Sequence, residues 1–112
     1  MKNEHKTSWG CVLCGTPTSI LHEIFPGMGR KSICIKYNLQ VPLCTKCHNM
    51  AHGRIRNEQV GDNQQEYYKM LFCNILQLGY YRTFQGVQHR YHRQYLEDKK
   101  DNNLKIIKSF EL

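Results

Sequence analysis

The chain has few of the features that mark membrane-bound or secreted proteins. Its 112 residues contain no run of 18 apolar residues, which argues against a membrane-spanning helix. The polar segment Met1–Trp9 has no apolar stretch typical of a signal peptide, so we expect a cytoplasmic protein with reduced thiols. Acidic residues are also scarce, because nine Asp and Glu stand against 16 Lys and Arg, which gives a net charge of +7.

The positive charge is concentrated in the first half of the chain. Residues 1–56 contain eight Lys and Arg but only two acidic residues. A basic region of this kind suits a polyanion such as nucleic acid, although charge alone describes a solvated surface equally well. The same half carries the cysteine and histidine motifs, and this overlap favours nucleic acid as the partner.

Four of the six cysteines form two Cys-x-x-Cys pairs, Cys11 with Cys14 and Cys44 with Cys47. Each pair has the spacing that places two sulfurs on one tetrahedral ion. Paired thiols in a chain without a leader predict metal rather than disulfides, and we therefore predict a structural Zn²⁺. Such a site contributes about 10–16 kcal/mol in small peptides. The other two cysteines lack a pair and are predicted to be buried thiols: Cys34 and Cys73.

We expect a single α+β domain over residues 1–112. Ser19–Phe25 and Leu39–Leu43 are predicted strands of a hairpin with a long connection, and Pro42 restricts the second strand to an edge or an end. Thr45–His52 is a predicted short helix that ends before Gly53.

A helical extension is expected over residues 62–98, packed on the metal-bound unit. Asn63–Glu66 has the form of a capping box, and the helix that it opens is predicted to end near Leu78. A second helix is expected over residues 87–98, and the charged segment 99–112 is expected to be a mobile tail. The apolar residues of the first helix are predicted to face the core: Tyr67, Met70, Leu71, Ile75 and Leu78, widened by Tyr68, Phe72 and Leu76.

Within residues 11–53, three histidines and one carboxylate accompany the four paired cysteines. His48 and His52 lie one helical turn apart, so both rings can face one point. His22 and Glu23 are neighbours on the first strand and point to opposite faces, unless a bulge re-aims one of them. A divalent ion held by such groups can polarise a phosphate, and a neutral histidine can deprotonate water.

Residues 11–53 resemble the His-Asn-His (HNH) nuclease family, and they are most similar to its small phage and prophage members. The resemblance lies in Cys11–Cys14, in Leu21–Gly27 and in Val41–His52. It implies a ββα-metal fold that clasps one catalytic divalent ion such as Mg²⁺ or Mn²⁺. It further implies a metal-dependent endonuclease that hydrolyses DNA in a bacterial host, alongside other phage or host DNA-processing proteins.

The resemblance also assigns roles to individual residues. His22 and Glu23 fall on the pair that supplies one metal ligand and one general base; we favour His22 as the base and leave the reverse open. His48 falls on the position that orients the base or the phosphate, and His52 on a metal ligand. Basic residues near these motifs are expected to bind nucleic acid: Arg30, Lys31, Lys36, Lys46 and Arg54.

An alternative interpretation is a zinc-stabilised DNA-binding or adaptor module without catalytic activity. Glu23 carries this alternative, because the family more often has a histidine at that position. Divalent-ion-dependent DNA cleavage separates the two interpretations.

Overall fold

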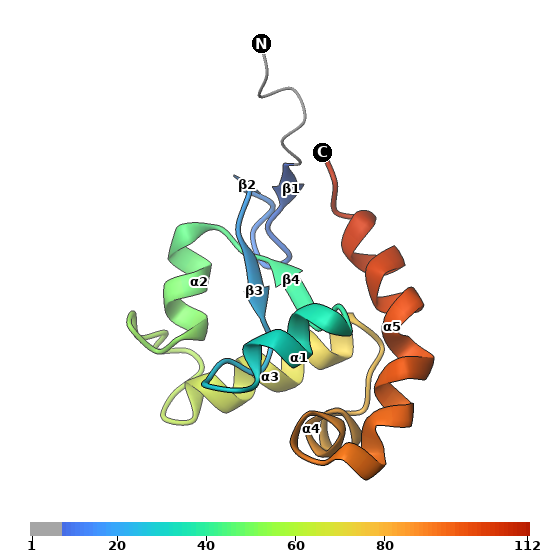
Figure 1. Ribbon diagram of the computed structural model, residues 1–112. Coiled ribbons are helices and arrows are strands. Elements are labelled where there is room, and N and C mark those ends of the chain that lie inside the picture. Colours follow the sequence, from blue (N-terminus) through green and yellow to red (C-terminus); the bar gives the residue numbers. More distant parts are fainter. Residues whose placement is uncertain (1–7) are drawn as a thin grey trace.

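The computed structural model describes residues 8–112 and has a mixed α+β architecture, which confirms the predicted class (Figure 1). Strand β1 (Trp9–Gly10) pairs antiparallel with β2 (Pro17–Thr18), and β3 (Leu21–Glu23) pairs antiparallel with β4 (Gln40–Pro42). Residues 1–7 lie outside the described part of the chain. They include most of the polar segment Met1–Trp9 and two of the eight basic residues of the first half, Lys2 and Lys6.

The β3–β4 hairpin has the long connection that the sequence predicts. His22 lies opposite Val41 in the register, and Glu23 lies opposite Gln40. The connection contains helix α1 (Lys31–Lys36), which follows a basic loop. Asn38, with φ +59°, turns the chain from α1 into β4, a conformation that asparagine tolerates better than most residues.

Helix α2 (Thr45–Ala51) follows β4 directly and confirms the predicted short helix. The chain leaves it through Gly53, whose φ of +78° is accessible to glycine at little cost. In Figure 1, α2 lies on one side of the β3–β4 hairpin and α5 on the other. The hairpin is therefore covered from both sides.

The C-terminal half contains three helices and a short 3₁₀ segment: α3 (Gln64–Ile75), α4 (Tyr80–Gln88), η2 (Arg90–His92) and α5 (Arg93–Lys108). The expected single helix over residues 87–98 is wrong, because α4 ends and α5 begins inside it. The expected mobile tail is also wrong, since α5 continues to Lys108. The chain end then pairs with the first strand: the amide of Leu112 donates to the carbonyl of Ser8 at 2.9 Å.

Helix α3 packs through only part of the predicted apolar face. Tyr68, Phe72 and Leu76 are buried, whereas Tyr67 and Met70 are about half exposed. The predicted capping box is absent, because the Asn63 side chain makes no capping hydrogen bond. The apolar residues of this helix form two adjacent stripes, and the aromatic one packs on the core.

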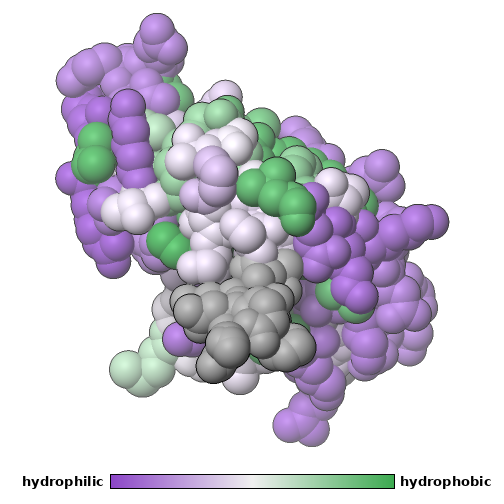
Figure 2. Space-filling view, turned by 90° about the horizontal axis from the view of Figure 1, so that it is seen from above, coloured by the Kyte–Doolittle hydropathy of each residue, from purple (hydrophilic) through white to green (hydrophobic). Residues whose placement is uncertain are grey.

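One buried core joins the hairpin to the helices. It contains Ile24 and Phe25 after β3, Val41 in β4, Phe72 in α3 and Leu96 in α5. Figure 2 shows hydrophilic residues on both flanks of the molecule seen from above, with hydrophobic and intermediate residues between them, next to the grey atoms. None of the helices in residues 8–112 has the length and apolar character needed to cross a bilayer.

Candidate metal centres

The two Cys-x-x-Cys pairs meet as predicted. Their four sulfurs lie within 4.8 Å of one another. The Cys14 sulfur lies 3.6 Å from that of Cys44 and 3.9 Å from that of Cys47. Sulfurs of a tetrahedral zinc site with bonds of about 2.3 Å are separated by about 3.8 Å. The cluster therefore has the size of a structural zinc site.

The electrostatics of the four thiols also favour a cation among them. Hydrogen bonds with Thr16, and after them with Cys44, lower the pKa of Cys14 to about 6. Burial raises the pKa of Cys47, and interactions with the neighbouring thiols raise it further. Ionising all four thiols together therefore requires a positive charge at the centre of the cluster, which a divalent ion supplies.

The two unpaired cysteines lie elsewhere in the core. Cys34 and Cys73 are both fully buried, and neither belongs to a metal-binding cluster among the described residues. Burial raises the pKa of Cys34 to about 11 and that of Cys73 to about 12. They are neutral packing residues, as predicted.

The three histidines form a second cluster, with one ligand nitrogen of each within 4.8 Å of the others. Strand β3 contributes His22, and α2 contributes His48 and His52. The Nε2 atoms of His48 and His52 are 3.1 Å apart. Two nitrogens on one tetrahedral zinc, with bonds of about 2.0–2.1 Å, are separated by about 3.3–3.4 Å. The cluster is thus close to the geometry that a single ion requires.

Burial keeps the three imidazoles neutral. His22 is only 3% exposed, and burial, followed by the charges of His52 and His48, lowers its pKa to about 3. Burial also lowers the pKa values of His48 and His52, although the charge of Glu23 opposes the change. Neutral imidazole is the form that binds metal.

Glu23 does not join this cluster. His22 is buried towards α2, whereas Glu23 is only partly buried and accepts a hydrogen bond from the Gln40 side chain at 3.1 Å. This arrangement follows from regular strand alternation, because β3 and β4 pair without a bulge at these positions. The structure thus brings together three of the four predicted catalytic residues.

A pocket of about 290 Å³ opens beside the histidines. His22 and His52 line it together with residues from α3. No residue of α3 was predicted from the sequence to belong to the site. Gln65 and Lys69 contribute the polar part of this α3 wall. They lie 13 and 17 residues beyond His52 in a separate helix, and no motif spacing connects them to the histidines.

Two glutamines fix α3 against the end of α2. The buried Gln64 side chain donates to the carbonyls of Met50 and Ile55, at 2.7 Å each. Gln65 donates to the carbonyl of His52. The Met50 carbonyl also accepts a hydrogen bond from the amide of Gly53, so the glutamines add to the bonds that close the end of α2. They also hold the pocket wall in a fixed position relative to His52.

The predicted nucleic-acid residues fall into two groups, of which the first lies near the histidines. The Arg30 guanidinium lies 6.0 Å from the centroid of the Phe84 ring, and its side chain passes beside Gly27, which lines the histidine pocket. Arg54 donates to Asn49, and its charge helps to lower the pKa of His48. Both arginines therefore lie near the histidine site.

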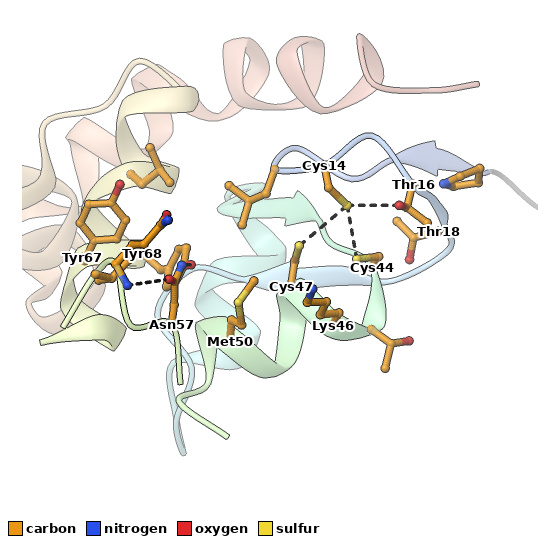
Figure 3. Close-up of a pocket in the computed structure, with 16 residues that line it drawn as sticks. Cys14, Thr16, Thr18, Cys44, Lys46, Cys47, Met50, Asn57, Tyr67 and Tyr68 are labelled. Atoms are coloured by element: carbon orange, nitrogen blue, oxygen red, sulfur yellow. Dashed lines mark hydrogen bonds between the residues drawn. The ribbon is translucent and has the colours of Figure 1, made fainter. Parts of the chain in front are cut away.

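The second group comprises exposed lysines that do not line the histidine pocket. Lys31 and Lys36 are exposed at the two ends of α1. Lys46 lines a wider groove of about 1050 Å³ beside the cysteine cluster, together with Tyr67 and Tyr68 (Figure 3). The five predicted cations therefore do not line one common pocket among the described residues.

Comparison of the chain with protein-family models, with curated proteins and with solved structures finds no match. The function is therefore argued from the geometry of the two clusters.

Proposed function

We propose that the chain is a metal-dependent phosphodiesterase of the His-Asn-His type that cleaves DNA. The observation that carries the proposal is the cluster of His22, His48 and His52, which lies beside an open pocket. The cysteine cluster supports it, because a structural ion there would fasten α2, which carries two of the histidines. The resemblance of residues 11–53 to phage and prophage nucleases adds DNA as the substrate class.

The donor set decides which ions suit the histidine site. Three imidazole nitrogens fit Zn²⁺ and Ni²⁺ well, Mn²⁺ less well and Mg²⁺ least, because Mg²⁺ prefers oxygen ligands. A bound ion would lower the pKa of a coordinated water and polarise a phosphate oxygen. Of the two ions expected from the sequence, the site therefore favours Mn²⁺ over Mg²⁺.

The environment of His22 favours a role as third ligand over the role of base expected from the sequence. A base with a pKa of about 3 holds a proton only weakly at neutral pH. The 3% exposure of His22 also keeps bulk water from its ring. The same low pKa favours metal binding by His22, because protons compete less with the metal for the imidazole nitrogen.

Hydrolysis consumes one water for each bond cleaved. The water oxygen forms a bond to phosphorus while the bond from phosphorus to the bridging oxygen breaks. One proton of the water ends on the departing alkoxide, which leaves one phosphate end and one hydroxyl end. Arg30, whose side chain lies beside Gly27 of the pocket wall, would bind a phosphate oxygen of the substrate.

Conversion of supercoiled plasmid to nicked or linear DNA tests the proposal. The protein is assayed with Ni²⁺, Mn²⁺, Zn²⁺ and Mg²⁺, and His52→Ala is compared with the matched control His89→Ala, which changes an exposed histidine on another element. We expect cleavage that His52→Ala reduces at least 100-fold and His89→Ala leaves unchanged. Intact plasmid with every ion, from a folded protein that retains its zinc, would contradict the proposal. DNA binding in that case would support the adaptor alternative.

A further inference from the structure

We propose that Lys69 of α3 binds a non-bridging phosphate oxygen of the DNA strand in the pocket beside the histidine cluster. The inference rests on the proposed function, because it places the substrate of that same site. It adds a positioning contact from the C-terminal half, outside the segment that carries the cysteine and histidine motifs.

The charges that line the pocket favour an anion. Lys69 is the one formally charged side chain among the described residues that line it, and no carboxylate lies among them. A single ammonium group in a small, partly enclosed site attracts a phosphate more strongly than the same group on an open surface.

Lys69 lines the pocket, and its present partner, Glu66, is one that a phosphate can replace. Its side chain is 21% exposed, and its Nζ atom lies 3.1 Å from Glu66, one helical turn earlier. Glu66 is itself 53% exposed and also accepts a hydrogen bond from the hydroxyl of Tyr80. An ion pair this exposed contributes little to stability, so a phosphate can replace the carboxylate at small cost.

The size of the pocket limits what it can hold. At about 290 Å³ it lies at the lower end of the range for ligand sites, which suits one phosphate with part of its sugar rather than a base pair. Gly27 also lines the pocket, with the Arg30 side chain beside it. A strand that passes over the histidines would therefore lie near two cations, Lys69 and Arg30.

The α3 wall is held rigidly enough to position a substrate. Gln65, four residues before Lys69, donates to the carbonyl of His52 and covers Gly53 so closely that a Cβ there would lie 3.0 Å from its side chain. Lys69 on α3 and His52 at the end of α2 therefore lie on two helices that this hydrogen bond joins. Fixed positioning of this kind is what substrate-orienting residues require.

The test compares Lys69→Met with Lys100→Met by DNA binding at several salt concentrations. Lys100 forms a similar i, i+3 pair with Glu97 on α5 and does not line the pocket, so it is the matched control. The protein carries only its cysteine-bound zinc, so no cleavage interferes. We expect Lys69→Met to weaken binding about five- to tenfold near 0.1 M salt and to lower the salt-dependence slope by about 0.9. Lys100→Met should change neither quantity.

Two further variants separate phosphate binding from a structural role. Lys69→Arg should restore the slope, and Glu66→Gln should leave it unchanged or raise it, because it frees the ammonium group. The inference would be overturned if Lys69→Met left the salt-dependence slope unchanged. It would also be overturned if Glu66→Gln weakened DNA binding as much as Lys69→Met does. Should Lys69→Met not fold, Lys69→Gln takes its place.

Failure of the inference and failure of the nuclease proposal give different results. Cleavage of plasmid by the unchanged protein, together with a normal binding slope for Lys69→Met, would retain the nuclease and remove Lys69. If Lys69→Met lowers the salt-dependence slope of DNA binding but the unchanged protein cleaves no plasmid, Lys69 is retained as a phosphate ligand in a DNA-binding protein.

Discussion

The Nε2 atoms of His48 and His52 lie 3.1 Å apart on successive turns of α2. Two neutral imidazoles at this separation can share a single ion, since the spacing is close to that of two ligands on one tetrahedral metal. His22 lies edge-on to both rings, with centroid separations of 5.1 and 5.0 Å. The relationship defines a second group of residues that could hold an ion, separate from the four cysteines.

Removal of His22 distinguishes a ligand from a base. If His22 is a ligand, His22→Ala should weaken binding of Ni²⁺ or Zn²⁺ at the histidine cluster at least tenfold, because one of three metal bonds is lost. A base would leave metal affinity unchanged and lower kcat alone. Calorimetric metal titration of protein that already holds its cysteine-bound zinc measures the difference. Unchanged affinity in His22→Ala would contradict the ligand assignment.

The stability of the protein should fall as pH falls from about 6.5 towards 3. In this range the unfolded chain takes up a proton at His22, whose ordinary pKa is 6.5, whereas the folded chain does not because its pKa is about 3. The loss from this group amounts to about 1.5–2 kcal/mol between pH 6.5 and 5. Urea unfolding of the unchanged protein and of His22→Gln, with the histidine site free of metal, isolates the effect. Equal pH slopes would contradict it.

The four-cysteine cluster should be essential for folding, and the isolated thiols should not be. Cys47→Ser is expected to lose the zinc and the folded state, because a structural zinc contributes energy comparable to the whole stability of a small domain. Cys34→Ala should retain one zinc and unfold cooperatively, with a cost of about 1–2 kcal/mol for the lost packing. Zinc content and circular dichroism measure both. A folded, zinc-bound Cys47→Ser protein would rule out the proposed role of the cluster.

Gln64 should contribute more to the free energy of unfolding than a polar side chain usually does. It is 6% exposed, and its side chain also accepts a hydrogen bond from the amide of Asn57 at 2.7 Å. Gln64→Ala leaves buried groups without partners and should cost about 2–4 kcal/mol. The exposed Gln94→Ala on α5 is the control and should cost under about 0.5 kcal/mol. Similar costs for the two variants in urea unfolding would show that Gln64 does not join α3 to α2.

Features fixed by short spacings could be predicted from the sequence. The Cys-x-x-Cys pairs, the one-turn separation of His48 and His52 and the alternation of His22 with Glu23 are local patterns, and the structure follows them. The α3 wall could not be predicted, because Gln65 and Lys69 reach the site through tertiary packing. Their sequence context reads as an ordinary polar helix surface.

The C-terminal segment shows a second limit of the sequence pattern. Residues 99–112 are rich in charge, which favoured a mobile tail, yet α5 buries Leu96, Asn103 and Ile107 along one face. Asn103 lies fully buried and donates to the carbonyl of Tyr37 at 3.0 Å. A polar residue at a core position interrupts the apolar periodicity from which a packed helix is recognised.

The central claim is that the histidine cluster holds a second ion, distinct from the ion on the cysteines. Anomalous diffraction from a crystal soaked in Mn²⁺ or Ni²⁺, measured on both sides of the absorption edges of zinc and of the soaked metal, tests it most directly. The account predicts zinc among Cys11, Cys14, Cys44 and Cys47, and the soaked metal among His22, His48 and His52. A single anomalous peak on the sulfurs, with the three histidines free of metal, would contradict it.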